Sequence, residues 1–306
     1  MINQDDINFF TGNILWFPPN AMILNINQFY DIIFPQRDFD IIGVYGRGGF
    51  GLVLHVRHKI TNRDYALKLL HHNGEDTDRE FRLQSIFANY NMAPKLHHYE
   101  VIVKNKYPLI INGGERVFDI VFAMALMDPI TMTVDKYIFR GGDLKRLYYP
   151  FECLIIKKYL LNYPNSLLHG DMHIANIAIL KDGKTLGFID FGWTFDKPSI
   201  LQVLDCIPLI SFLVNDPSRR GIPLAKFLVK LYNKMFKINL VLNNFTTLKC
   251  GGYTYHDQDT NSFLHSYNWE LNRFVNDPFM KVVKGHVTIE DLKKVFPKIE
   301  PPKVKD

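Results

Sequence analysis

Between residues 40 and 128, short apolar runs alternate with polar turn residues, a pattern typical of strands that bury one face. Three such runs precede a stretch with apolar residues at helical spacing, and two follow it. The expected strands are Asp40–Val44, Leu52–Arg57, Tyr65–Leu70, Lys95–Val103 and Val117–Met127. The expected helix is Thr77–Tyr90, which Pro94 bounds. The pattern therefore predicts a small lobe of five strands and one helix.

After Asp128 the periodicity becomes mainly helical. Apolar residues in Leu224–Met235 follow the spacing of an amphipathic helix. Further helices are expected at Phe151–Leu161, Ser199–Val214 and Thr288–Phe296, and short strands and turns at Ser166–Ile189. The chain is thus expected to divide into an N-terminal extension over 1–39, a strand-rich lobe over 40–128, a mainly helical lobe over 129–296 and a loose tail over 297–306.

Composition is that of an ordinary globular protein. Of the 306 residues, 47% are hydrophobic and 22% are charged, which is enough to form a substantial core. The net charge of +5 is spread along the chain, and this argues against a nucleic-acid partner. The three cysteines lie far apart, so neither a disulfide framework nor a zinc site is expected.

The chain carries no targeting or membrane signal that we recognise. Its N-terminus lacks the basic segment of a secretory signal. The longest apolar stretches, Ile120–Met127 and Cys206–Val214, are far shorter than the roughly 20 residues of a membrane span. We therefore expect an intracellular, cytoplasmic protein with no membrane partner. The Asn- and Ile-rich composition would suit an AT-rich microbe or a large DNA virus, and a viral chain would lie in the host cytoplasm.

A glycine-rich segment, Gly46–Gly51, follows the first expected strand and reads GRGGFG. Glycines without a Cβ let backbone N–H groups approach phosphates closely. A plain hairpin turn and a dinucleotide-binding loop share this pattern, but a dinucleotide loop opens a helix and this one leads into a strand. The expected nucleotide-binding residues here and on the next two strands are Gly46, Gly48, Gly49, Gly51, Val53, Ala66 and Lys68.

Lys68 lies on the third expected strand, on the same face as Ala66. The small Ala66 leaves room for a purine ring, and the ammonium group beside it can reach phosphates. Glu80, at the start of the following helix, is the natural ion-pair partner of Lys68. The alternative is that Thr77 and Glu80 form a capping box and Lys68 is a surface lysine.

The strongest evidence for an activity comes from two segments that each contain one aspartate, LHGDMHIAN at Leu168–Asn176 and GFIDFG at Gly187–Gly192. Phosphoryl transfer needs a carboxylate at the attacking hydroxyl and oxygen ligands for Mg²⁺. Asp171 is the expected catalytic carboxylate, and Asn176 and Asp190 are the expected metal ligands.

These residues resemble the protein-kinase-like superfamily over about residues 40–210. The front half of this region, from the glycine loop through Tyr65–Lys68, looks like a eukaryotic-type serine/threonine kinase, and Asp190–Gly192 reads Asp-Phe-Gly. The resemblance implies a two-lobed α+β fold with a small antiparallel-sheet N-lobe and a mainly helical C-lobe. It also implies ATP and Mg²⁺ as cofactors, with adenine against Met124–Asp128 in the cleft.

The catalytic loop departs from protein kinases. Gly170 replaces the arginine before the catalytic aspartate, and His173 replaces the lysine two residues after it. The resulting His-Gly-Asp-x-His resembles aminoglycoside and choline kinases, which makes His173 a candidate catalytic residue. No Ala-Pro-Glu motif follows Gly192, so a full activation segment is not expected. Asp205 matches either a buried aspartate that supports the catalytic loop or an ordinary surface residue.

The leading expectation is a serine/threonine protein kinase that uses ATP to phosphorylate a hydroxyl of a protein substrate. A small-molecule kinase is the alternative enzyme, and a nucleotide-binding pseudokinase scaffold is the alternative of another class. Since Gly170 offers no side chain to grip a phosphate, we expect activity to need no phosphorylation between Gly192 and Ser199. Thr194 and Ser199 are then predicted to be dispensable.

Overall fold

The computed structural model describes residues 2–17, 24–48, 51–111, 114–160, 167–192, 194–196, 209–210, 213, 220–236, 241–243, 247–250 and 253–256. The chain forms two compact units. Unit 1 comprises Met1–Ser85 and Pro94–Ile130, and unit 2 comprises Ile86–Ala93 and Thr131–Asp306. The domain limits drawn from the sequence stay a prediction. Among the described helices, none has the length and apolar character needed to cross a membrane.

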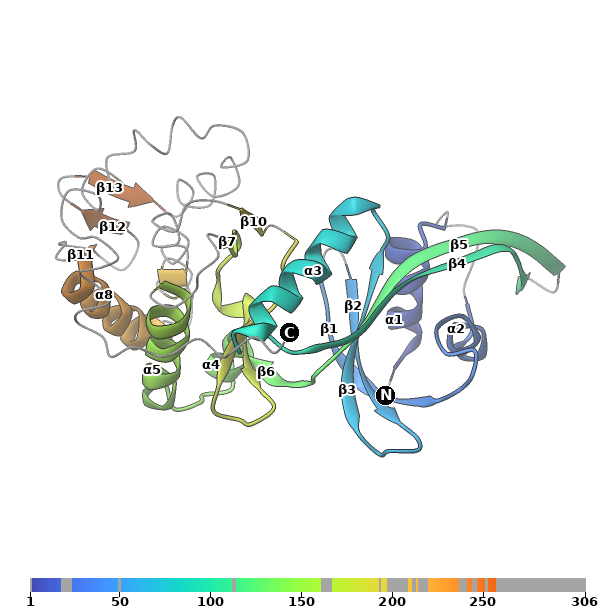
Figure 1. The fold of residues 1–306 in the computed structure, drawn as a ribbon, viewed down its shortest axis with the longest axis horizontal. Helices are drawn as coiled ribbons and strands as arrows, with labels where there is room; N and C mark the ends of the chain where they lie inside the picture. Colours follow the sequence, from blue (N-terminus) through green and yellow to red (C-terminus); the bar gives the residue numbers. More distant parts are fainter. Residues whose placement is uncertain are drawn as a thin grey trace. The chain divides into compact units, whose positions relative to one another are not determined.

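Unit 1 is built on a five-stranded antiparallel sheet in the order β1-β2-β3-β5-β4 (Figure 1). The strands are β1 Phe39–Arg47, β2 Gly51–His58, β3 Asp64–His71, β4 Leu96–Ile111 and β5 Gly114–Met127. Helix α3, Glu75–Asn89, follows β3. The predicted five strands and one helix are therefore confirmed.

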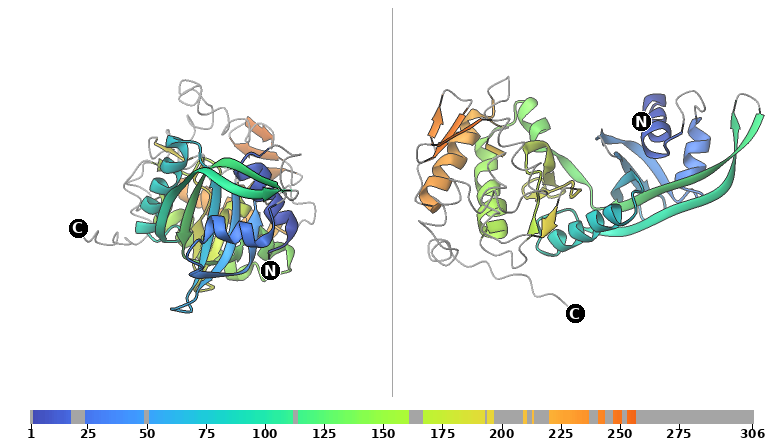
Figure 2. Two further views of the ribbon diagram at one scale, coloured as in Figure 1. Left: turned by 90° about the vertical axis from the view of Figure 1, so that its right-hand side faces the viewer. Right: turned by 90° about the horizontal axis from the view of Figure 1, so that it is seen from above.

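The hairpin of β4 and β5 is longer than the sequence predicts and runs on past the other strands (Figures 1 and 2). The expected strand stopped at Val103 because the polar run after it resembles a turn. In the structure the register shifts between Lys104 and Tyr107, and Lys106 has a φ of +50°. A β-bulge thus absorbs the polar residues and lets the strand continue.

One face of the sheet is covered by the N-terminal residues. These form α1 Gln4–Phe9, the π-helix η1 Phe10–Ile14 and α2 Ile26–Ile33. Phe10 lies edge-on to Phe29 and to Phe122 of β5, with ring centroids 5.0 and 5.4 Å apart. The sequence assigned residues 1–39 only to an extension with some short structure. In the structure they complete the larger hydrophobic core of unit 1.

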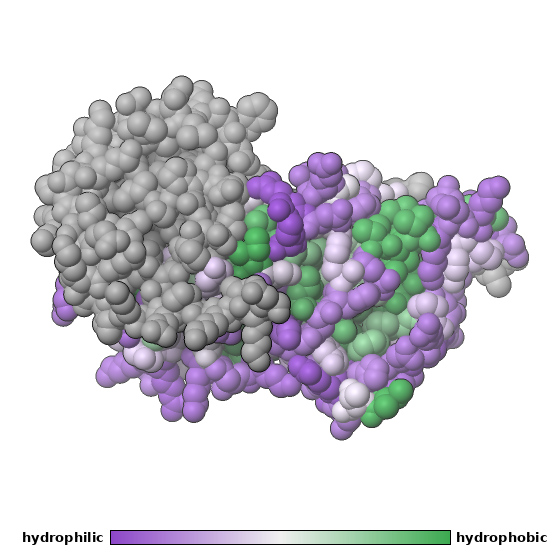
Figure 3. Space-filling model, in the orientation of Figure 1, coloured by the Kyte–Doolittle hydropathy of each residue, from purple (hydrophilic) through white to green (hydrophobic). Residues whose placement is uncertain are grey.

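The opposite face of the sheet carries α3 (Figure 1). Phe81 of α3 is buried against Ala66 and Leu70 of β3, with Val53 and Tyr45 at the edge of this cluster. Alternate residues of a strand share a face, so Lys68 lies on this side too. The surface of unit 1 in Figure 3 is largely hydrophilic with separate hydrophobic patches.

Unit 2 contains short strands and helices in its described part. The elements are β6 Ile130–Thr133, α4 Val134–Phe139, α5 Lys145–Phe151, π-helix η2 Glu152–Leu160, β7 Leu167–Leu168, 3₁₀-helix η3 Ile174–Asn176, β8 Ile177–Leu180, β9 Leu186–Phe188, β10 Phe195–Asp196, α8 Ile222–Phe236, β11 Val241–Asn243, β12 Thr247–Cys250 and β13 Tyr253–His256. Strands β6, β8 and β9 form one small sheet. The aromatic rings of Phe87, Tyr159, Phe188 and Phe191 pack in the core beneath the residues that follow β9.

The helix predicted within Leu224–Met235 is confirmed as α8. The helix predicted at Phe151–Leu161 begins earlier, at Lys145, and becomes a π-helix after Pro150. Pro150 has no backbone N–H to donate, so the sequence predicts a helix boundary there. In the structure the chain stays helical through Pro150 and continues as the π-helix. The predicted helix at Thr288–Phe296 and the tail over 297–306 lie outside the described residues, as does most of Ser199–Val214.

Candidate active site

The glycine-rich segment of unit 1 forms the connection between β1 and β2. Gly46 pairs with Val53, and the N–H of Gly48 donates to the carbonyl of Gly51 at 2.9 Å. A Cβ on Gly51 would lie 2.5 Å from Leu70 Cδ2, so Gly51 has a packing role. A Cβ on Gly48 would meet no atom of the described residues within 4 Å. Gly49 lies outside the described residues.

The side chains of Lys68 and Glu80 form an ion pair, with Nζ 2.5 Å from Oε1. Both side chains are largely shielded, at 14% and 11% exposure. Helix α3 begins at Glu75, so Thr77 lies within its first turn and its hydroxyl accepts the N–H of Asn73 at 2.9 Å. The capping-box interpretation is therefore wrong, and the predicted ion pair is present.

Both apolar and polar side chains lie on the same face of the sheet as Lys68. Val53 is paired with Lys68 across the strands, and Ala66 is 3% exposed. Tyr45, directly before the glycine segment, stacks on His55 with ring centroids 5.1 Å apart. Burial, and to a lesser extent the charge of Asp64, raise the pKa of Tyr45 to about 12. The phenol therefore stays protonated at neutral pH and can donate a hydrogen bond.

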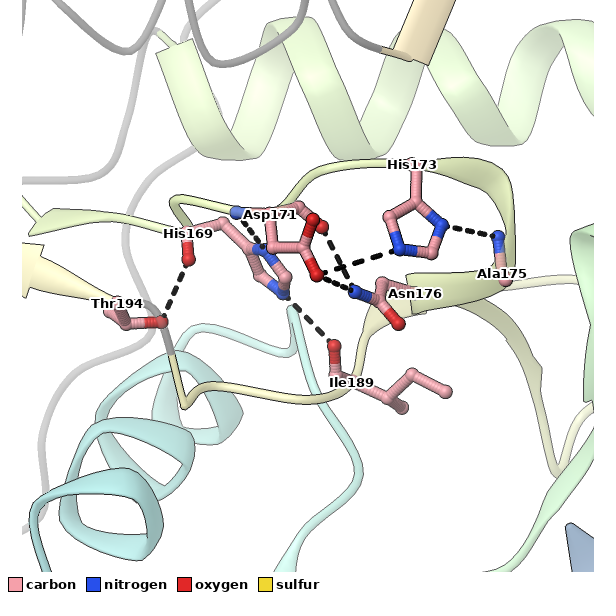
Figure 4. Close-up of polar contacts among 7 residues, drawn as sticks. All are labelled: His169, Asp171, His173, Ala175, Asn176, Ile189 and Thr194. Carbon is pink, nitrogen blue, oxygen red and sulfur yellow. Dashed lines mark hydrogen bonds and ion pairs between the residues drawn. The ribbon is translucent and has the colours of Figure 1, made fainter. Parts of the chain in front are cut away.

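In unit 2 the catalytic-loop segment is organised around His169, which is fully buried (Figure 4). Its Nε2 donates to the carbonyl of Ile189 at 3.0 Å, and its Nδ1 accepts the N–H of Asp171 at 3.4 Å. These partners require the ring proton on Nε2. The backbone N–H of His169 donates to the hydroxyl of Tyr159 at 3.1 Å. His169 thus joins the segment before Asp171 to the segment before Asp190.

Gly170, between His169 and Asp171, has a φ of +82°. Side chains other than glycine rarely adopt this left-handed conformation, and a β-carbon there costs roughly 1 kcal/mol or more. The glycine that departs from the protein-kinase pattern thus suits the left-handed backbone of this loop better than a residue with a side chain would.

Asp171 receives two side-chain contacts on the same carboxylate oxygen (Figure 4). Asn176 Nδ2 donates to Oδ2 at 2.9 Å and to the backbone carbonyl of Asp171 at 3.0 Å. His173 Nε2 lies 3.5 Å from the same Oδ2. His173 Nδ1 accepts the N–H of Ala175 and caps η3, so the ring proton faces Asp171. The two side chains fix the orientation of the Asp171 carboxylate.

Asn176 and Asp190, the predicted metal ligands, lie on neighbouring chain segments. Strands β8 and β9 pair so that the N–H of Ile189 donates to the carbonyl of Asn176 at 3.0 Å. Because the Asn176 amide nitrogen is engaged by Asp171, its amide oxygen points away from Asp171 (Figure 4). Asp190 follows Ile189 and has a φ of +65°. A non-glycine residue held in this region is a local strain that often marks a functional site.

This donor set fits Mg²⁺ better than a transition metal. The described residues contain no group of three His, Cys, Asp or Glu side chains that could enclose a metal ion. Magnesium is commonly held by one or two protein oxygens together with substrate phosphates. One amide oxygen from Asn176 and one carboxylate from Asp190 suit that mode, and neither is a soft ligand.

Thr194 has a structural role that the sequence did not reveal. Its hydroxyl donates to the backbone carbonyl of His169 at 3.1 Å, and the residue is 1% exposed. That activity does not depend on Thr194 stays a prediction, but its buried hydroxyl ties this segment to the segment that contains His169. The same burial keeps the hydroxyl from a modifying enzyme. Ser199 and Asp205 lie outside the described residues.

We predict that Thr194→Val lowers the free energy of unfolding by about 1–3 kcal/mol, because the buried carbonyl of His169 loses its donor. Valine keeps the β-branched shape, and Thr194→Ser, which keeps the hydroxyl, is the matched control. Chemical denaturation of the three proteins measures the difference. Equal stability of the valine and serine variants would show that the hydrogen bond has no role.

The chain is similar in sequence to several known proteins. No family model matches the chain. It is 26% identical over 176 residues to RAC-beta serine/threonine-protein kinase A of Xenopus laevis. This match covers 51% of this chain and 30% of the relative. Over 66 residues it is 37% identical to eukaryotic translation initiation factor 2-alpha kinase 2 of Schizosaccharomyces pombe, covering 22% of this chain and 10% of the relative.

A shorter match to human Rho-associated protein kinase 1 has 47% identity over 45 residues, which is 15% of this chain and 3% of the relative. A solved kinase-domain structure aligns with 56% of this chain and 59% of its own, at 18% identity and a TM-score of 0.38. The chain spans less than a third of the length of the curated relatives it matches. These separate matches lead to three different kinds of protein kinase, so the chain is similar to members of the protein-kinase-like superfamily.

Proposed function

We propose that this protein is an ATP-dependent phosphotransferase that transfers the γ-phosphoryl group to a hydroxyl. The observation that carries the proposal is the arrangement around Asp171. Its carboxylate is oriented by Asn176 and His173, and the Asn176 amide oxygen is left facing away from it. A positioned proton acceptor beside a magnesium ligand is what phosphoryl transfer requires.

Each site residue has one role in this proposal. Asp171 accepts the proton of the acceptor hydroxyl. Asn176 and Asp190 hold Mg²⁺, which when bound neutralises charge on the phosphate oxygens. Lys68, kept in place by Glu80, holds the phosphates, and the glycine segment offers them backbone N–H groups.

The acceptor in the leading form of the proposal is a serine or threonine of a protein. The relatives named as serine/threonine kinases support this form. The glycine loop and Lys68, which resemble the front half of a eukaryotic-type kinase, support it as well.

A small-molecule acceptor is the second candidate, and His173 is the observation that favours it. An imidazole N–H lies 3.5 Å from the Asp171 carboxylate at the position where protein kinases carry a lysine. An imidazole there gives less attraction to phosphate than the compact ammonium group of a lysine would. A compact acceptor such as a sugar or an amino alcohol would suit that environment.

One incubation separates the candidates. The protein is given γ-labelled ATP and Mg²⁺ with either a panel of denatured proteins or a panel of small hydroxyl compounds, and Asp171→Ala is run beside it. Label on protein serine or threonine, lost in Asp171→Ala, supports the leading form. Label only on a small compound supports the second. No transfer despite bound ATP would favour the third hypothesis, that the protein is a pseudokinase scaffold.

Lys68→Ala is predicted to lower kcat about a hundredfold while ATP affinity changes much less, because Lys68 orients phosphates that other groups also bind. Steady-state kinetics and equilibrium ATP binding measure the two effects. Lys59→Ala, which removes a more exposed lysine in the turn that follows β2, is the control and should match the parent. A Lys68→Ala variant with parent kcat would contradict the assigned role.

A further inference from the structure

The glycine-rich segment is tied to the N-terminal helix through Arg47, which stands between Gly46 and Gly48. Its Nε lies 3.0 Å from Asp6 Oδ1, and one guanidinium N–H donates to the backbone carbonyl of Asp5 at 3.3 Å. Both partners come from the first turn of α1. A side chain at the end of β1 is thus held by the first helix of unit 1.

Asp6 is built into the protein more firmly than a surface partner would be. It is 3% exposed, and its second oxygen accepts the backbone N–H of Asn3 at 3.0 Å in a capping box. Both carboxylate oxygens therefore have donors. A buried carboxylate needs such partners, because an unpaired buried charge is strongly unfavourable.

The segment that carries Asp6 is itself anchored on the sheet. The π-helix that follows α1 buries Phe10 and Ile14 completely. The Nδ1 of His71, at the end of β3, contacts the carbonyl of Ile14 at 2.9 Å, and Trp16 stacks on the His71 ring with centroids 4.0 Å apart. Asp6 thus offers Arg47 a fixed point rather than a mobile one.

We propose that Asp6 is a positioning residue for the phosphate-binding loop, acting through Arg47. A loop rich in glycine loses much conformational entropy when it closes on a ligand. Fixing Arg47 beside Gly48 removes part of that loss before the ligand arrives, which favours binding. The inference rests on the proposed function, since it takes the loop's ligand to be the phosphates of ATP.

Two other roles for the ion pair of Asp6 with Arg47 lead to different predictions. If Arg47 itself binds phosphate, its replacement will weaken ATP binding and the replacement of Asp6 will not. If the pair only stabilises α1, its loss will lower overall stability and leave the loop and the KM for ATP unchanged.

The test uses Asp6→Asn in the full chain. Asparagine can still accept the N–H of Asn3 but presents no charge to Arg47. Asp5→Asn is the matched control, because Asp5 is exposed on the same turn and uses only its backbone carbonyl on Arg47. Hydrogen exchange of the backbone amides around the glycine loop is measured without nucleotide, and KM and kcat are measured with ATP.

We expect Asp6→Asn to speed exchange in the glycine loop and to raise the KM for ATP about three- to tenfold, with kcat within about twofold of the parent. Exchange in β3 and all values for Asp5→Asn should stay at the parent level. Arg47→Gln should reproduce the effect, and the double variant should be no worse than either single one. Additive effects, or unchanged exchange in the loop, would overturn the inference.

The proposed function and the positioning role of Asp6 can fail separately. If the parent binds no ATP, the proposed function fails, and loop exchange in Asp6→Asn still decides whether Asp6 restrains the loop. If the parent binds ATP and both variants bind equally well, the positioning role fails alone. Should Asp6→Asn fold poorly, Arg47→Lys keeps a cation near the buried Asp6 carboxylate but lacks the guanidinium that contacts both Asp5 and Asp6, and it gives the same comparison.

Discussion

Replacing Asp190 with Asn is expected to reduce phosphoryl transfer by about a thousandfold or more, since the metal loses its charged protein ligand. The change should leave the fold intact. Asp190 has a φ of +65°, and asparagine is among the few residues that tolerate this conformation. Turnover is measured across a range of Mg²⁺ concentrations, with thermal unfolding as a check on folding.

Asp182→Asn is the matched control for this variant. Asp182 lies in the turn that joins β8 to β9, so the same chemical change is made in the same hairpin but outside the proposed metal site. The control should turn over at close to the parent rate. Near-parent turnover by Asp190→Asn would mean that Asp190 does not hold the metal.

Asp171→Asn is expected to lower kcat by about a hundred- to ten-thousandfold, because an amide cannot accept the proton of the attacking hydroxyl. ATP binding should change less than kcat, since the amide keeps an oxygen that can accept from Asn176 and the proposal assigns Asp171 no contact with phosphate. Single-turnover kinetics with pre-bound ATP isolate the chemical step. Loss of ATP binding in step with kcat would contradict the role of Asp171 as proton acceptor.

The sequence predicts the sheet of unit 1 well because its strands have clear apolar alternation and turn residues between them. It also predicts the contact of Lys68 with Glu80, since strand alternation and the helix that follows bring both to one face. The strand ends are predicted less well. The bulge near Lys106 depends on pairing with β5, which local sequence does not show.

The contacts that hold the loops in place are not visible in the sequence. Thr194 and Tyr159 are single hydroxyl residues with no motif around them, and their hydrogen bonds to His169 depend on tertiary packing. The ion pair of Asp6 with Arg47 joins residues far apart in the chain. Only the fold brings such residues together, so composition and spacing give no signal for them.

Gly170 stands where protein kinases carry an arginine, and the backbone conformation at this position favours a glycine. From the sequence, the missing arginine indicates that no phosphate is gripped at this position. The structure adds that the backbone there has a φ of +82°, so a side chain would strain the loop. The absence of a phosphate-binding arginine and the shape of the catalytic loop are therefore consequences of one residue.

The most direct test of the central claim follows the γ-phosphoryl group itself. The parent protein and Asp171→Asn are incubated with Mg²⁺ and ATP labelled either at the γ or at the α position, and label on the acceptor is counted. We expect transfer from γ-labelled ATP only, dependent on Mg²⁺ and lost in Asp171→Asn. A parent protein that binds ATP yet transfers no γ-label to any protein or small hydroxyl compound would contradict it.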